Sequence, residues 1–223
     1  MIQKLLRISL LLIIGLQLQG CINYTQKVSL NRDGSGTIEV HYWMDIPESD
    51  SSGILPDSVG LFDTTKVRDV FSADYTTIQS ITVYRDSTDS TLHAQIIMDF
   101  KHLDSLNALV PFQGYEFSFK EGAAGQSVVS QKIPPLPIAP GTEPTKFIAT
   151  YIYDLHGEMI THNAQKIDGT KLSWRYYADE IGQGKNIAIT YKPYKIKETP
   201  QWIYGLMVFT LLVVVYFLFR KKK

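Results

Sequence analysis

The chain has 223 residues, 44% of them hydrophobic, and its 22 basic and 22 acidic side chains give a formal net charge of zero. This length suits one globular domain with short additions at its ends. The balanced charge excludes the basic surface field of a nucleic-acid-binding protein, and the single cysteine excludes an internal disulfide framework.

Residues 1–20 have the pattern of a secretory signal peptide. Lys4 and Arg7 precede an apolar run over residues 8–16, and the small residue Gly20 stands directly before Cys21. Segments with this order are removed from the mature protein. The tetrapeptide LQGC that ends at Cys21 resembles a bacterial lipobox. That resemblance implies that the Cys21 thiol receives a diacylglyceryl group, with acyl chains such as palmitate, and that Cys21 becomes the mature N-terminus. An uncleaved N-terminal anchor is the alternative.

The first segment of the mature chain predicts a β-hairpin. Apolar and polar residues alternate on both sides of Asp33, Gly34 and Gly36, and a period of two is typical of strands with one apolar face. Pairing of the two apolar faces requires a loop with an odd number of residues. We expect Leu30 to lie opposite Ile38, and Val28 opposite Val40.

Residues 31–42, NRDGSGTIEVHY, also have most of the oxygen spacing of an EF-hand calcium loop. An EF-hand needs a bidentate glutamate at position twelve and a helix on each side. Position twelve is Tyr42, and both flanks alternate as strands do. We therefore interpret Asp33 as a turn-capping side chain and the glycines as residues that supply positive φ.

A repeated order of two strands and one short helix is expected over residues 22–110. Asp63 is a typical N-cap for a helix with an apolar face at Val67, Val70 and Phe71. Residues 101–110 predict a second short helix, because Leu103, Leu106 and Val110 share a face.

A second hairpin is predicted between these helices, with its turn at residues 86–89. Its apolar faces place Ile81 and Val83 opposite Ala94 and Leu92.

Five further strands are expected in the second half of the domain. A proline-rich stretch near residues 134–145 cannot continue a central strand, because proline lacks a backbone donor. The expected strands cover residues 115–119, 127–133, 147–153, 171–177 and 186–191.

The C-terminal segment predicts a transmembrane helix over residues 202–219, followed by a cytoplasmic basic tail at residues 220–223. Residues 203–219 carry no charge, and aromatic residues stand near both ends of this run. A buried core helix is the alternative.

With the signal peptide, this pattern places a domain of residues 21–195 on the outer side of the inner membrane of a bacterial cell. All 22 acidic residues but only 16 of the 22 basic ones lie in residues 22–201, so this part is acidic.

The order of these features resembles the LppM-type family of bacterial lipoprotein domains. The resemblance covers nearly all of residues 21–219 and departs in the longer proline-rich stretch and at His156. It implies an α+β fold with a curved antiparallel sheet of hairpins and two short helices, in an envelope lipoprotein that contacts lipid. The positions that carry it are Asp33, Gly34, Gly36, Gly157, Asn163, Asp168, Gly169 and Trp174.

Catalytic chemistry is not apparent in the sequence. His156, Glu158 and His162 form the local cluster that we single out as a candidate metal site, and a polar turn is the simpler interpretation. Asp99 and Asp104 form a carboxylate pair that flanks an expected helix start. Nucleophile-elbow, HExxH and phosphate-loop motifs are absent from the sequence. We therefore expect no enzyme, no cofactor and no metal.

Two non-catalytic functions stay open. The domain could bind lipid, glycolipid or another apolar ligand in a groove lined by Tyr151, Tyr153, Trp174 and Tyr176. Alternatively, it could be a protein–protein interaction or assembly module at the inner membrane. A metal-dependent hydrolase is a distant third. The expected partners are the membrane and a lipid or envelope protein, with no nucleic acid.

Overall fold

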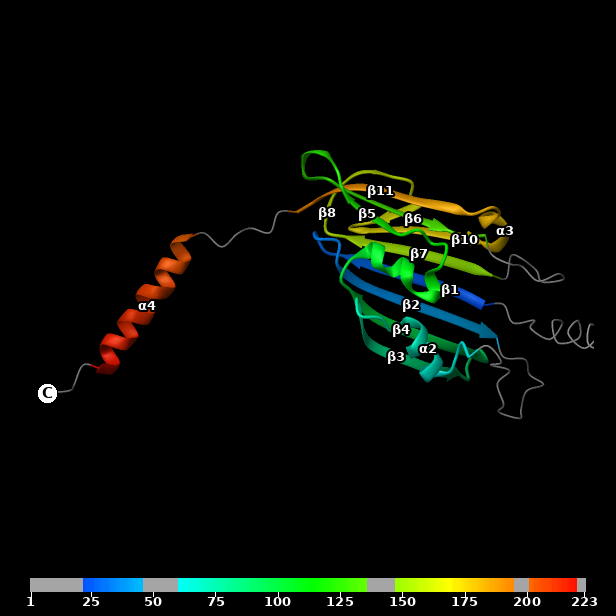
Figure 1. Cartoon of the computed structure of the whole chain (residues 1–223), viewed down its shortest axis with the longest axis horizontal. Coiled ribbons are helices and arrows are strands. Elements are labelled where there is room, and N and C mark those ends of the chain that lie inside the picture. The colour runs from blue at the N-terminus through cyan, green and yellow to red at the C-terminus, as the bar shows by residue number, and fades with distance from the viewer. Residues whose placement is uncertain (1–21, 46–59, 136–146, 195–200, 220–223) are drawn as a thin grey trace, which may run out of the picture. The chain divides into compact units, whose positions relative to one another are not determined.

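The structure, a computed structural model, describes residues 22–45, 60–135, 147–194 and 201–219 (Figure 1). They belong to two separate compact units, one that ends at Pro193 and one that begins at Tyr194. The first unit contains both sheets and the hydrophobic core. In the second, the structure describes one helix, α4 (Gln201–Phe219).

Eleven strands of the first unit form two sheets. The seven-stranded sheet has the order β3 (Thr76–Asp86), β4 (Thr91–Phe100), β2 (Gly36–Asp45), β1 (Ile22–Leu30), β7 (Ile148–Leu155), β10 (Lys171–Tyr177) and β9 (Lys166–Asp168). The four-stranded sheet has the order β5 (Ser118–Glu121), β6 (Ser127–Ile133), β11 (Lys185–Pro193) and β8 (Gly157–His162).

Short helices occupy the connections between strands. The α-helices are α2 (Thr64–Phe71) and α3 (Ala178–Ile181), and the 3-10 helices are η1 (Leu103–Ala108), η2 (Val110–Phe112) and η3 (Ala123–Gly125). Figure 1 shows α2 and the turns after β4 in front of the large sheet. Side chains from both sheets and from these helices form one continuous core.

The fold class differs from the α+β expectation, because the first unit is mostly β. The segment at residues 101–110 is not an α-helix but the 3-10 helix η1 followed by η2. Pro111 lacks a backbone donor, and the Asn107 side chain is bonded to the backbone of Phe117, so an α-helix cannot continue there. Two strands, β8 and β9, lie in a segment that the sequence left as a turn region.

The large sheet is also not purely antiparallel. Strand β1 pairs antiparallel with β2 and parallel with β7, which begins far along the chain. This parallel pair joins the two halves of the sheet. The three predicted late strands at residues 147–153, 171–177 and 186–191 are confirmed as β7, β10 and β11.

The first hairpin has the expected odd loop, residues 31–35, but its register is shifted by two residues. Leu30 lies opposite Gly36, and Val28 lies opposite Ile38. The backbone N–H of Asn31 donates to Ser35 O at 2.8 Å, which closes the loop directly after Leu30. The predicted pairs Leu30–Ile38 and Val28–Val40 are therefore wrong, although the same side chains face the core.

The second hairpin is shifted in the same way. Ile81 lies opposite Ile96, and Val83 lies opposite Ala94. The turn consists of residues 87–90 rather than 86–89, because Asp86 Oδ1 accepts a hydrogen bond from Thr88 N at 2.8 Å and remains paired in the strand.

The predicted transmembrane helix at residues 202–219 is corrected. Helix α4 forms over nearly the same residues, but crossing a bilayer requires a helix that is both long enough and continuously apolar. In the ranges that the structure describes, no helix meets that requirement.

Candidate functional site

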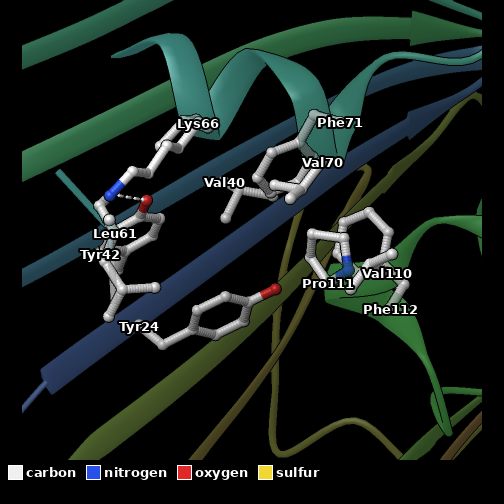
Figure 2. Close-up of a pocket in the computed structure, with 12 residues that line it drawn as sticks. Tyr24, Val40, Tyr42, Leu61, Lys66, Val70, Phe71, Val110, Pro111 and Phe112 are labelled. Atoms are coloured by element: carbon white, nitrogen blue, oxygen red, sulfur yellow. Dashed lines mark hydrogen bonds between the residues drawn. The ribbon is translucent and has the colours of Figure 1, made fainter. Parts of the chain in front are cut away.

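An apolar groove of about 320 Å³ lies between helix α2, 3-10 helix η2 and strands β1 and β2 (Figure 2). Both helices stand over the core face of the large sheet, so their side chains form the walls and the strands form the floor. The groove is lined by Tyr24, Val40, Tyr42, Gly60, Leu61, Lys66, Val67, Val70, Phe71, Val110, Pro111 and Phe112.

Helix α2 forms one wall, and its start is set by Asp63, as the sequence predicts. Asp63 Oδ1 accepts hydrogen bonds from Thr65 N at 2.9 Å and from the Thr65 hydroxyl at 2.5 Å. These bonds hold the pKa of the Asp63 carboxyl below its usual value. Val67 and Phe71 are buried on the inner face, whereas Val70 stands partly exposed at the mouth of the groove.

Aromatic contacts hold the opposite wall. The Phe112 ring meets Phe71 edge to face at 5.8 Å and meets Phe117 in the same geometry at 5.4 Å. Such pairs add stability beyond their buried area. At the other end, the Tyr42 hydroxyl donates to Leu61 O, which ties the segment before α2 to strand β2. The groove is therefore a preformed feature with packed walls.

A polar network lies at the inner end of the groove. Figure 2 shows the Tyr24 hydroxyl directed toward the η2 side. This hydroxyl donates to Gln26 Oε1 at 3.1 Å, and the Gln26 and Gln131 amides bond to each other at 3.0 and 3.2 Å. The Tyr153 hydroxyl donates to Gln131 Oε1 at 2.6 Å. Burial raises the pKa of Tyr24 well above its usual value, so its hydroxyl remains protonated and can donate.

Sequence reasoning missed this network. Gln26 and Gln131 are almost completely buried and join β1 of the large sheet to β6 of the small one. The available signal was the position of Gln26, which shares the inward face of its strand with Tyr24 and Val28. A polar residue inside an apolar alternation has to find a buried partner.

The four aromatic residues predicted to line a ligand site occupy other positions. Tyr151, Tyr153 and Trp174 are buried in the core, and Tyr176 is half-buried against it. They are not among the residues that line the groove. The Tyr151 ring contacts that of Tyr24, which lines the groove, with 5.8 Å between the ring centroids.

The turn residues of the first hairpin have structural roles. Asp33 Oδ1 accepts a hydrogen bond from Ser35 N at 3.1 Å, and Gly34 adopts a φ of 81°. Gly36 is required by close packing, since a Cβ there would stand 2.1 Å from Ser29 O.

The late motif residues gather around Trp174. Its indole Nε1 donates to Asn163 O at 3.0 Å and lies 3.2 Å from Asn163 Oδ1. The same amide donates to Asn186 O at 2.7 Å, so Asn163 links β10 to β11. Asp168 ends β9, and Gly169 turns the chain with a φ of 60°.

Gly157 begins β8 at a tight contact between strands. A Cβ at this position would stand 2.5 Å from Lys192 O on β11. Cys21, the signal peptide at residues 1–20, the basic tail at residues 220–223 and most of the proline-rich stretch lie outside the described residues.

The candidate metal-ligating residues of the sequence lie along strand β8 and directly before it. His156, Glu158 and His162 do not form a ligand cluster, and His162 Nδ1 instead accepts from Ala164 N at 3.1 Å. His41 of β2 and His93 of β4 meet with 3.0 Å between His41 Nε2 and His93 Nδ1. Burial lowers the pKa of His41.

The carboxylate pair Asp99 and Asp104 also has structural roles. Asp99 accepts hydrogen bonds from Thr37 and Gln79, each at 2.7 Å, and Asp104 accepts one from Phe119 N at 2.7 Å.

Comparison with known proteins places the fold. No protein-family model and no curated protein matches the sequence. Among solved structures, the chain is similar to a folded domain of a bacterial protein, with a TM-score of 0.51 and 12% sequence identity. That structure is the NMR structure of the folded domain of LppM from Mycobacterium tuberculosis, and the match covers 81% of this chain and 95% of that domain. The chain therefore has an LppM-like fold.

Proposed function

We propose that this chain is an envelope lipoprotein whose β domain binds the acyl chain of an anionic lipid in the groove beneath α2. The observation that carries the proposal is the groove itself, an apolar cavity of about 320 Å³ with packed aromatic walls. Small-molecule sites are concave, mostly apolar and largely preformed, and they begin at about 300 Å³.

Charge at the groove supports an anionic headgroup. Of the twelve lining residues, Lys66 alone is charged, and its side chain is exposed at the rim beside Leu61 and Gly60. Residues 22–201 hold 22 acidic and 16 basic side chains, and within this acidic part Lys66 places a positive charge at the rim of the groove. An acyl chain that enters between Val70 and Val110 leaves its headgroup within reach of the Lys66 ammonium.

The envelope location rests on the N-terminal sequence and on the fold. The LQGC tetrapeptide that ends at Cys21 resembles a lipobox, and the LppM-like fold agrees with the family resemblance seen in the sequence.

Metabolic labelling with a palmitate analogue should mark the full chain. Replacement Cys21→Ser should abolish the label. Equal labelling of both forms would contradict lipidation at Cys21.

Binding should be measured on residues 22–194, which contain both sheets and the hydrophobic core, with fatty acids of increasing length. Each buried methylene contributes ~0.8 kcal/mol, so each added carbon should tighten Kd about fourfold until the groove is filled. A Kd that does not depend on chain length would refute acyl recognition.

Two matched pairs of variants locate the site. Val70→Glu puts a charge at the groove mouth, whereas Val128→Glu puts one on β6 away from it, and the two valines are similarly exposed at 38% and 37%. Only Val70→Glu should abolish binding. Lys66→Met should weaken binding of fatty acids but not of their methyl esters, and Lys120→Met on β5 should change neither. Equal effects within either pair would contradict the assignment.

A further inference from the structure

A second site lies at the turn between β3 and β4, on the outward face of the sheet. Asp86, Asp89 and His93 each offer a ligand atom there, and these atoms lie within 4.8 Å of one another. We propose that this cluster is a binding site for a divalent transition-metal ion of the zinc class. The site is independent of the acyl groove.

The contacts of His93 determine which of its nitrogens faces the acids. His93 Nδ1 lies 3.0 Å from His41 Nε2 on the neighbouring strand. His93 Nε2 lies 2.6 Å from the Thr91 hydroxyl, which in turn is bonded to Asp89 Oδ1. Nε2 is therefore the atom on the carboxylate side, and it is the ligand atom that we assign.

Ring stacking fixes the orientation of the His93 imidazole. The Tyr84 ring on β3 lies 4.7 Å from it at an angle of 3°, and the His41 ring on β2 lies 5.2 Å from it at 20°. Trp43 extends the stack beside His41. A ligand held between neighbouring rings loses little freedom when the ion binds, which favours affinity.

His41 also supplies a hydrogen-bond acceptor for the ring N–H of His93 that would not bind the ion. A ligating imidazole almost always donates its other ring N–H to an acceptor, which fixes the tautomer. With the ion on His93 Nε2, the proton resides on Nδ1 and is donated to His41 Nε2. The observed separation of 3.0 Å is a hydrogen-bond distance.

The two carboxylates have an oxygen available. The backbone N–H groups of the turn donate to Oδ1 of each carboxylate, from Thr88 to Asp86 at 2.8 Å and from Thr91 to Asp89 at 3.2 Å. The backbone thus holds each carboxylate while Oδ2 can face the ion.

The donor set selects the class of ion. One imidazole and two carboxylates suit zinc and its neighbours better than calcium, which takes oxygen ligands alone. Ligands around tetrahedral zinc are roughly 3.4 Å apart, given bonds of about 2.0–2.2 Å. Because the ligand atoms lie within 4.8 Å of one another, the turn must close by at most about 1.4 Å on binding, and solvent supplies the remaining ligand.

The test is a titration of the full chain with Zn²⁺ at pH 7.5, followed by calorimetry and by the ring nitrogen resonances of the histidines. We expect one equivalent to bind, with the largest shift at His93 Nε2. His93→Phe keeps the stack but removes the ligand, and it should abolish binding. Asp89→Asn, an exposed change, should weaken it strongly.

The variant His41→Phe separates the hydrogen-bonding role of His41 from its stacking on the His93 ring. It keeps an aromatic ring beside His93 but removes the acceptor, so the affinity should fall by about 10- to 100-fold while the stoichiometry stays the same. His162→Phe, at an exposed histidine on β8, should leave binding unchanged. Absence of Zn²⁺ binding by the wild-type chain, or binding by His93→Phe equal to that of the wild type, would overturn the proposal.

Discussion

Replacement of Gln131 by methionine should destabilise the domain more than the small difference in side-chain volume would. Gln131 is almost completely buried and accepts hydrogen bonds from Gln26 Nε2 at 3.0 Å and from the Tyr153 hydroxyl at 2.6 Å. Methionine has a similar volume and flexible shape, so the packing loss is small. The cost arises because two buried donors lose their acceptor.

The magnitude follows from counting those groups. Each buried polar group left without a partner costs about 1–3 kcal/mol, so Gln131→Met should lower the free energy of unfolding by about 2–6 kcal/mol. Tyr153→Phe in the wild-type protein should cost only about 1 kcal/mol, because Gln131 keeps its bond from Gln26. Burial raises the pKa of Tyr153, so its hydroxyl remains a donor throughout the working pH range.

The decisive measurement is the double-mutant cycle. In the Gln131→Met background, Tyr153→Phe removes a hydroxyl that has lost its acceptor and should therefore raise the free energy of unfolding. In the wild-type background the same replacement should lower it. Urea unfolding of residues 22–194, followed by the fluorescence of Trp43 and Trp174, gives the four free energies. If Tyr153→Phe lowers the free energy of unfolding equally in both backgrounds, the hydrogen-bond network is not the source of the destabilisation by Gln131→Met.

Three further outcomes are expected in the same assay. Gly36→Ala should cost about 3 kcal/mol or more, since its Cβ would stand 2.1 Å from a backbone oxygen, whereas Gly169→Ala, in open space at a φ of 60°, should cost about 1 kcal/mol. Asn163→Ala should cost about 1–2 kcal/mol and shift the emission of Trp174, and an unchanged emission would contradict the indole contact. Asp63→Ala should lower the urea midpoint at pH 6. Because folding lowers the pKa of this carboxyl from 3.8, its stabilising effect is complete above that pH and is lost as pH falls below it. A difference between the two proteins that persists unchanged at pH 2 would contradict the capping role.

Short-range features of the fold could be predicted from the sequence. The alternation around Asp33 predicted the first hairpin and its inward face, and Asp63 predicted the start of α2. Both depend on interactions within a few residues, namely side-chain direction along a strand and a side-chain oxygen that satisfies helix N–H groups. The sequence also singled out Asn163 and Trp174, which the structure brings into direct contact.

Register and the candidate sites required the tertiary structure. Both hairpins are shifted by two residues from the predicted pairing, because hydrogen bonds in each turn decide where the loop closes and a shift of two keeps every side chain on its face. The parallel pair of β1 with β7 joins residues that are distant in the chain.

Both candidate sites depend on such distant pairings. The acyl groove needs α2 and η2 over the same strands, and the metal site needs His41 of β2 beside His93 of β4. The sequence by itself determined which residues face inward and where the short elements begin. Tertiary packing alone decided which of them meet, because a local pattern constrains side-chain direction but not the choice of partner across the fold.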